Sequence, residues 1–447
     1  MHFGLDPYLG HILYAAAVAA LLASVFWRPI VGIFYLLPLI PLQTIRYRLN
    51  DFPLGTSILG IMLVGVALGV LRRRQPLPPK TPWTRLLVIY GVFTFVSLCL
   101  GALFLGTAFP IFGEERFEFW QGYMLMPGLL LLVAAVEPTR RQMAAMVVVM
   151  CLSCLMLDRS FASEISGRDF SKFSNELRDV GGNMGYAGTN GLGAFEAQFT
   201  MLLLALAAFE RRRLLRLGYY ALSVFSMFCL MYSLSRGAYL ALFAGCLFLG
   251  AVKQRKLLLL TAAFLLTWTA IVPPAVTERV TMTRQDGELD HSAGTRLTIW
   301  EDAVELVDAN ILTGTGFNTY AYMHRVDKYE DTHNFFLKVL VETGVAGLLL
   351  FLWLVVKMFR TGYRLFRQAE DPFFAALGLG LAGWMIAAVA ANCFGDRWTY
   401  FQVAGYMWVL AGLVARAVAL ENEDATDEAG THAKDAEIEE PEMATAV

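Results

Sequence analysis

His333 is the residue of this sequence whose type and setting best suit proton transfer. It stands in the segment Thr332-His333-Asn334, where a long polar loop ends and an apolar run begins. A histidine side chain ordinarily titrates near pH 6.5, so at neutral pH it can accept the proton of an attacking hydroxyl group. His291 and His324 are competing bases in the same loop, and ordinary surface polarity accounts better for both.

Two arginines have settings that suit an anionic ligand. Arg236 stands in a short polar break, SLSRGAY, between two apolar runs, and Arg296 lies four residues before Trp300 on one face of a predicted helix. The planar guanidinium group binds phosphate oxygens through two parallel hydrogen bonds and keeps its proton. We favour ligand binding for Arg236, with a snorkelling side chain at the membrane boundary as the alternative.

Glu196 is an ionisable residue inside the apolar run 191–209. At 1.5 Å per residue it lies about 9 Å into that helix. An ionisable group at this depth lines a cavity or has a partner. A structural ion pair and a substrate contact are both open for it.

Metal and nucleotide sites are not predicted. The outer loops contain no HxxH, HExxH, paired CxxC or DxD spacing, and the chain has no Walker or Rossmann glycine motif. Asp327, Glu330 and Asp331 could bind a divalent ion, but a solvated acidic run is the more ordinary interpretation. We therefore expect no metal and no cofactor.

The composition predicts the elements that must position these residues. Of 447 residues, 57% are hydrophobic and 17% charged, whereas a membrane-spanning helix takes roughly 20 apolar residues. This excludes a soluble enzyme, a disordered chain and a disulfide scaffold, and the continuous apolar runs disfavour a β-barrel. We predict an all-α polytopic membrane protein with about 12 or 13 transmembrane helices. The candidate spans are 11–27, 29–45, 54–71, 86–109, 121–136, 142–157, 191–209, 217–233, 238–252, 257–271, 344–358, 373–393 and 400–418.

Basic clusters predict the orientation, because short cytoplasmic loops collect Lys and Arg. Such clusters follow alternate spans, at 72–80, 140–141, 211–216, 253–256 and 357–367. The long loops 158–190 and 272–342 then lie on the outer side, as does Arg236, where the charge rule disfavours arginine. Arg46 and Arg48 also break the rule; either the first two spans are threaded wrongly or these arginines bind a ligand.

The transmembrane domain is predicted over 11–420, and the acidic tail 421–447 is predicted to be disordered and cytoplasmic. Within the outer loop, residues 295–310 predict an amphipathic helix whose apolar residues repeat at three- and four-residue spacing. These residues are Leu297, Trp300, Val304 and Val307. A glycine-containing turn, GTGFNTY at 314–320, follows this helix. Long loops on a rigid scaffold commonly carry function.

The order and spacing of five motifs resemble the C-terminal half of the O-antigen ligase and polymerase superfamily. The motifs are SRGAY (235–239), RLTIW (296–300), GTGFNTY (314–320), THN (332–334) and ETGVAGLLLF (342–351). The resemblance covers about 235–351, and the preceding part is similar only in having many spans. It implies a GT-C-like, inverting and metal-independent membrane glycosyltransferase, with its active face in the periplasm of a bacterial inner membrane.

The resemblance also implies roles for single residues. Its donor is a glycan on undecaprenyl diphosphate, so Arg236 and Arg296 would bind the diphosphate and His333 would be catalytic. Arg325, eight residues before His333, matches no motif firmly and is a weaker addition to the diphosphate site. Glu196, Trp300 and Asn334 are the candidate residues of the substrate cavity.

Several functions agree with these residues. We favour ligation of the glycan to the lipid A core, a step of lipopolysaccharide biosynthesis. Polymerisation, in which the acceptor is another lipid-linked glycan, is the runner-up, and protein O-glycosylation is third. A transporter is disfavoured because the polar groups gather at the outer ends of the spans, and because the two halves show no repeat.

Overall fold

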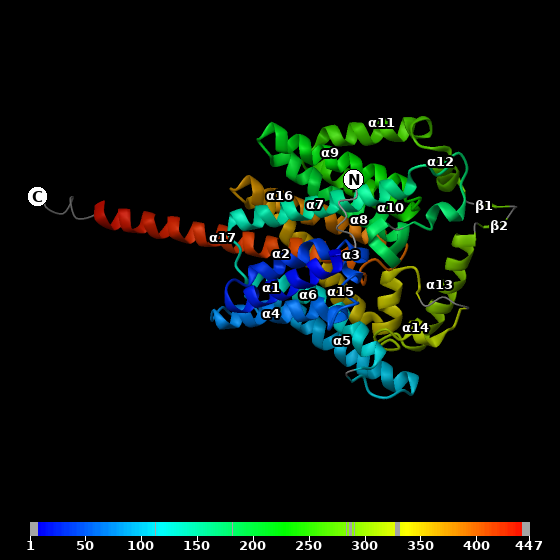
Figure 1. The fold of residues 1–447 in the computed structure, drawn as a ribbon, viewed down its shortest axis with the longest axis horizontal. Helices are drawn as coiled ribbons and strands as arrows, with labels where there is room; N and C mark the ends of the chain where they lie inside the picture. Colours follow the sequence, from blue (N-terminus) through cyan, green and yellow to red (C-terminus); the bar gives the residue numbers. More distant parts are fainter. Residues whose placement is uncertain are drawn as a thin grey trace, which may run out of the picture.

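Figure 1 shows a bundle of helices in the computed structural model, which describes residues 8–111, 113–180, 182–282, 284–285, 288–289, 291–326 and 331–439. The architecture is helical, as predicted, with one small exception. Two-residue strands β1 (Arg284–Gln285) and β2 (Glu288–Leu289) pair antiparallel in the long outer loop. The remaining polar connections are short turns and 3₁₀-helices.

The chain up to residue 187 forms seven α-helices and three 3₁₀-helices among the described residues. They are α1 (Leu9–Phe26), α2 (Ile30–Leu39), α3 (Gln43–Tyr47), η2 (Gly55–Ser57), α4 (Ile58–Arg72), α5 (Thr84–Leu105), α6 (Glu115–Ala135), α7 (Arg140–Ile165), η3 (Asn175–Arg178) and η4 (Gly182–Ala187).

The rest of the chain contains the central helices and the large loop. Its helices are α8 (Gly188–Phe209), α9 (Arg213–Tyr232), α10 (Arg236–Val252), α11 (Arg255–Ile271), α12 (Pro274–Thr281), α13 (His291–Ala309), α14 (Tyr320–Met323), α15 (Phe335–Gln368), α16 (Pro372–Asn392) and α17 (Phe401–Glu439).

Ten helices of the described chain are long and apolar enough to cross a membrane. The number is eleven if α11 and α12, bent by 113° at their junction, count as one span. Two shorter apolar helices, α2 and α10, coincide with two more of the predicted spans. At 1.5 Å per residue they measure about 15 and 26 Å, less than a hydrocarbon core of about 30 Å. The sequence count of 12 or 13 therefore includes two helices shorter than a full crossing.

Helix α8 forms the centre of the bundle, and most of its residues are buried. It packs against α9, α10 and α16. Trp384 Nε1 on α16 donates a hydrogen bond of 2.7 Å to Gln198 Oε1 on α8. Glycines let α15 and α16 approach closely, since a Cβ on Gly378 would lie 2.6 Å from the carbonyl oxygen of Gly362. Small residues at helix contacts are typical of membrane bundles.

The amphipathic helix predicted at 295–310 is present as α13, but its core-facing side differs from the prediction. Ile299, Ala303 and Leu306 are the buried residues, and they pack against α14 and α15. Leu297 and Val304 are 45% and 49% exposed. The apolar stripe through Leu297 and Val304 therefore does not face the core.

Figure 1 shows how the helices differ between the two ends of the molecule. Helices α12, α13 and α14 and the hairpin gather at one end, and the last part of α17 projects from the opposite end. The backbone of residues 421–439 is helical, where the sequence predicted a disordered tail. This segment is rich in Ala and Glu, which favour helix, and contains no proline before Pro441. The helix of the preceding span can therefore continue.

Candidate active site

A cavity of about 370 Å³ lies among α8, α10, α12 and α13. This volume is typical of a small-molecule site. We call it the arginine cavity, because five arginines contribute to its lining: Arg178, Arg236, Arg279, Arg296 and Arg397. No Asp or Glu of the described chain lines it. Guanidinium groups are suited to binding a highly charged anion.

Arg236 reaches the arginine cavity because α10 begins there. Ser235 is the N-cap residue of α10, and both residues line the cavity together with Gly237 and Ala238. The N-terminal end of a helix carries partial positive charge, which adds to that of the arginines. Arg236 Nη1 also donates to the carbonyl oxygen of Met282 at 2.8 Å. The structure thus places Arg236 in the lining of the cavity, and its role in ligand binding stays a prediction.

Arg296 and Trp300 lie one turn apart on α13 and line the same cavity. Their four-residue spacing predicted a shared face, and the structure has both side chains on that face. Trp300 Nε1 donates to the carbonyl oxygen of Thr332 at 2.9 Å. The wall of the cavity therefore supports the backbone that carries the next residue, His333.

Three cavity arginines were not singled out from the sequence. Arg178 ends η3 and donates from Nη2 to Asn190 Oδ1 at 3.1 Å. Arg279 lies on α12 with its guanidinium carbon 4.9 Å from the ring centroid of Phe173, and Arg397 follows α16. All three fall in loops that the charge rule assigns to the outer side. The argument that favoured Arg236 could therefore have found them.

His333 directly follows Thr332, whose carbonyl oxygen contacts Trp300 of the cavity wall, but His333 is not one of the residues that line the cavity. Its backbone φ of 53° lies in the left-handed region, which residues other than glycine seldom adopt. The side chain is 34% exposed, so a substrate can reach it. Of the competing bases, His324 follows α14, and the side chain of His291 lies outside the described residues.

Asp331 faces the His333 imidazole. Its Oδ2 lies 3.5 Å from His333 Nδ1. Burial alone would raise the pKa of Asp331, but the hydrogen bond with His333 and the positive charges of Lys338 and Arg397 lower it to about 2. A carboxylate at Nδ1 keeps the proton on that nitrogen and leaves Nε2 as the acceptor. Asp331 therefore faces the histidine, while Asp327 and Glu330 lie outside the described residues.

Two predicted site residues have other contacts. Arg325 Nε lies 2.7 Å from Asp302 Oδ1, and its Nη2 lies 3.4 Å from Glu305 Oε2, so it is bound to α13. Asn334 caps α15, since its Oδ1 accepts from two backbone N–H groups of the first turn. The structure brings neither Arg325 nor Asn334 to the cavity. The two acidic side chains, one turn apart on α13, bind Arg325 there. Asn334 is occupied as the N-cap residue of α15.

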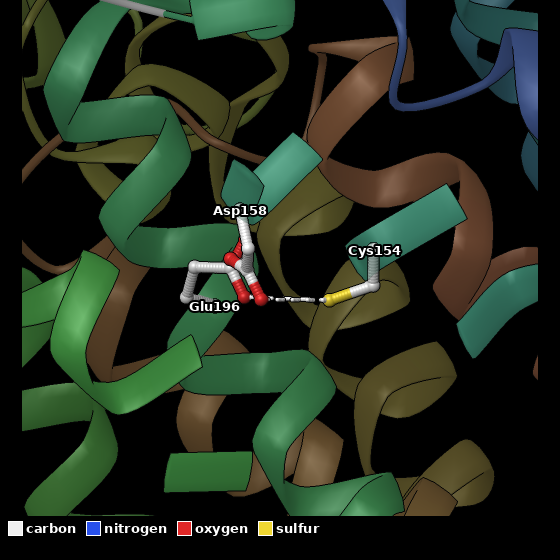
Figure 2. Close-up of side chains that lie close together, drawn as sticks. All are labelled: Cys154, Asp158 and Glu196. Atoms are coloured by element: carbon white, nitrogen blue, oxygen red, sulfur yellow. Dashed lines mark hydrogen bonds between the residues drawn. The ribbon is translucent and has the colours of Figure 1, made fainter. Parts of the chain in front are cut away.

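Glu196 is likewise not among the residues that line the arginine cavity. Figure 2 shows its carboxyl group beside that of Asp158, with the sulfur of Cys154 directed toward both. Cys154 Sγ lies 3.6 Å from Glu196 Oε2, and Ser226 Oγ donates to Asp158 Oδ2 at 3.0 Å. The partners of Glu196 within the bundle include a thiol and a carboxyl group from α7, and neither is a cation, so they do not form the ion pair that was one of the two open interpretations.

The cluster of Cys154, Asp158 and Glu196 is also the group of the described residues that could hold a metal ion. One ligand atom from each lies within 4.8 Å of the others, and all three residues are buried. Two carboxylates and a thiolate are suitable ligands for a divalent ion such as Zn²⁺. The cluster lies within the bundle and shares no residue with the arginine cavity.

The fold and the site define a class: a multi-pass helical membrane protein with a strongly basic cavity and an Asp–His pair at one end. A family model described as O-antigen ligase matches residues 221–352. This match includes Arg236, Arg296 and His333, and it confirms the resemblance to the O-antigen ligase and polymerase superfamily over that segment. The family also supports an enzymatic function. No curated protein matches the chain.

Proposed function

We propose that this protein is a membrane glycosyltransferase that moves a glycan from undecaprenyl diphosphate to an acceptor hydroxyl group. As an O-antigen ligase, it would take the lipid A core as acceptor. The observation that carries the proposal is the convergence of five arginines on one cavity whose wall contacts the His333 segment. Fixed cationic donors of this kind stabilise the charge that develops on a diphosphate leaving group.

The reaction divides into two tasks for these residues. The arginines bind the diphosphate and stabilise the negative charge left on its oxygen when the bond to the anomeric carbon breaks. Nε2 of His333 takes the proton of the acceptor hydroxyl group, whose oxygen forms the new bond to that carbon. Attack from the side opposite the leaving group inverts the configuration. Asp331 stabilises the imidazolium ion that forms.

The arginine cavity also bears on the need for a metal. In many transferases a divalent ion neutralises the diphosphate, a contribution worth several kcal/mol. Here the guanidinium groups of Arg236, Arg296 and their neighbours supply positive charge at the same place. We therefore propose that transfer needs neither a metal nor another cofactor.

The proposed site faces the periplasm, and the protein lies in the bacterial inner membrane. Lipid-linked donors in the outer leaflet could reach a cavity at that face. In support, the arginine cavity lies toward the end that carries α12 and α13, opposite the projecting part of α17 (Figure 1). Basic clusters at alternate loops assign the α17 end to the cytoplasm.

The experiment that tests the function is a deletion strain whose lipopolysaccharide and free polymer are separated on a gel. A ligase is expected to leave capped lipid without long chains, while undecaprenyl-linked polymer accumulates. Lipid that carries a single repeat would instead identify the runner-up, a polymerase, because that enzyme makes the long chains. Unchanged glycolipids would contradict both.

A further inference from the structure

A buried ion pair joins α15 to the loop between α16 and α17. Lys338 Nζ lies 3.1 Å from Asp396 Oδ2, and the two side chains are 9% and 3% exposed. Removing charges from water costs several kcal/mol for each ion, so such a pair adds little net stability over an apolar pair of similar size. A buried pair can instead fix one arrangement of the segments that it joins. The two segments here are those that carry His333 and Arg397.

At one end of the pair, the Asp396 carboxylate closes the turn whose backbone holds Arg397. The carbonyl oxygen of Asp396 accepts from Arg397 Nη1 at 3.0 Å, and its Oδ1 accepts from the Thr399 N–H at 3.0 Å. The Arg397 N–H donates to Asn392 Oδ1 at 2.9 Å. Both carboxylate oxygens of Asp396 thus have partners. Because Arg397 lines the arginine cavity, this turn fixes where its guanidinium group enters.

At the other end, Lys338 lies in the helical segment that begins directly after His333. Helix α15 is interrupted at Gly344, where φ is 65° and ψ is −173°, so residues 335–343 do not continue regularly into the span that follows. The position of this short segment therefore depends on its own contacts. The charges of Lys338 and Arg397 both act on Asp331, the partner of His333.

We propose that Lys338 and Asp396 are positioning residues, which hold Arg397 in register with the His333 segment and so strengthen binding of the donor diphosphate. Neither residue lines the arginine cavity, so they act through Arg397. The inference rests on the proposed function, because it takes a lipid diphosphate as the ligand.

A double-mutant cycle on the Kd of purified undecaprenyl diphosphate tests this role. The paired change Lys338→Met with Asp396→Leu replaces the ion pair by apolar side chains, which buried pairs commonly tolerate. A misdirected Arg397 loses a charge-assisted hydrogen bond, so we expect the Kd to rise about tenfold. In the Arg397→Ala protein the paired change should alter the Kd by less than about twofold, because its target is absent.

The matched control removes another ion pair, Arg416 to Glu423 at 3.0 Å on α17. Arg416→Met with Glu423→Leu should leave the Kd unchanged. If the Lys338 and Asp396 change prevents folding, Lys338→Arg and Asp396→Glu keep both charges but disturb the geometry of the pair, because a planar guanidinium group replaces the ammonium group and the carboxylate side chain is longer by one methylene. The same cycle and criteria then apply to those variants.

Two results would overturn the positioning role. One is a folded variant whose Kd stays within about threefold of wild type, and the other is a tenfold rise that persists in the Arg397→Ala protein. Wild-type protein that does not bind undecaprenyl diphosphate would contradict the proposed donor, and this inference with it. If the wild-type protein does bind undecaprenyl diphosphate, but the effects of the paired change and of Arg397→Ala on the Kd are additive, only the positioning role is overturned.

Discussion

Among single residues, Arg236 gives the clearest test of the diphosphate site. Arg236→Lys keeps the positive charge but removes the planar fork that binds two phosphate oxygens at once. A charge-assisted hydrogen bond is worth about 1.5–3 kcal/mol, so we expect kcat/KM for the donor to fall about tenfold or more. The measurement is the initial rate of transfer at several donor concentrations.

Arg325→Lys is the matched control for this change. Arg325 is bound to Asp302 and Glu305 on α13 and lies outside the cavity. Its replacement by lysine should therefore leave kcat/KM within about twofold, since exposed ion pairs contribute little. Full activity of Arg236→Lys, or an equal loss in both variants, would instead support the snorkelling interpretation of Arg236.

The two arginines also show how far sequence could predict the site. Membrane topology drew attention to Arg236, because arginine on the outer side needs a reason, and the structure places this residue in the cavity lining. Distance along the chain from His333 suggested Arg325, but the nearby acidic residues of α13 bind it. Arg397 lies more than 60 residues after His333, and only the packing of the α16–α17 loop brings it to the cavity. The charge rule could have made Arg397 a candidate, but its contact with the cavity cannot be read from local spacing.

Among the elements, the turn at 314–320 anchors the outer loop to the bundle. Glu342 Oε2 accepts from the Asn318 N–H at 2.9 Å, and the Glu342 carbonyl oxygen accepts from the Gly316 N–H at 2.7 Å. Gly316 has a φ of 110°, and a Cβ there would lie 2.1 Å from the Cα of Gly101 on α5. The glycine is thus required both by backbone conformation and by close packing.

Gly316→Ala should therefore destabilise the protein by about 1–3 kcal/mol, the usual cost of overpacking. The measurement is the thermal midpoint of the purified protein in detergent. Gly294→Ala is the control, because Gly294 lies on α13 with nothing within 4 Å of an added Cβ. A Gly316→Ala midpoint equal to that of Gly294→Ala would contradict the tight contact with α5.

The elements themselves were largely predictable, since apolar runs and glycine turns act locally. The helix at 295–310 and the special backbone of the Gly314–Tyr320 turn are both present. The buried face of α13 was not predictable from its apolar stripe, because Leu297 lines the cavity while Ile299 packs inward. The contact of Glu196 with α7 was likewise not predictable, because the packing of the whole bundle decides which helices are neighbours.

For the whole molecule, the arginine cavity and the buried cluster at Glu196 are separate sites, and this makes a metal test informative. Exhaustive EDTA treatment should leave the rate of glycan transfer unchanged, because arginines supply the positive charge at the diphosphate. The measurement is transfer from a purified undecaprenyl-diphosphate donor before and after treatment. A metal at the diphosphate would be worth several kcal/mol, so its loss would be evident.

The thermal midpoint serves as the control for the same treatment. A lower midpoint with an unchanged rate would assign a structural ion to Cys154, Asp158 and Glu196 and leave the arginine mechanism intact. Two results together would contradict the metal-independent mechanism. EDTA would inactivate the enzyme and one added divalent ion would restore its activity, and the Asp331→Asn variant would no longer show this response.

The proposed mechanism requires the arginine cavity to bind the donor while His333 removes the acceptor proton, and one comparison tests both parts. His333→Ala should bind undecaprenyl diphosphate with wild-type affinity, because His333 does not line the cavity. Its turnover in transfer from the purified donor should fall by about 10²–10⁴-fold, the usual contribution of a general base. Retention of more than about a tenth of the wild-type turnover would contradict the assignment of His333 as the base.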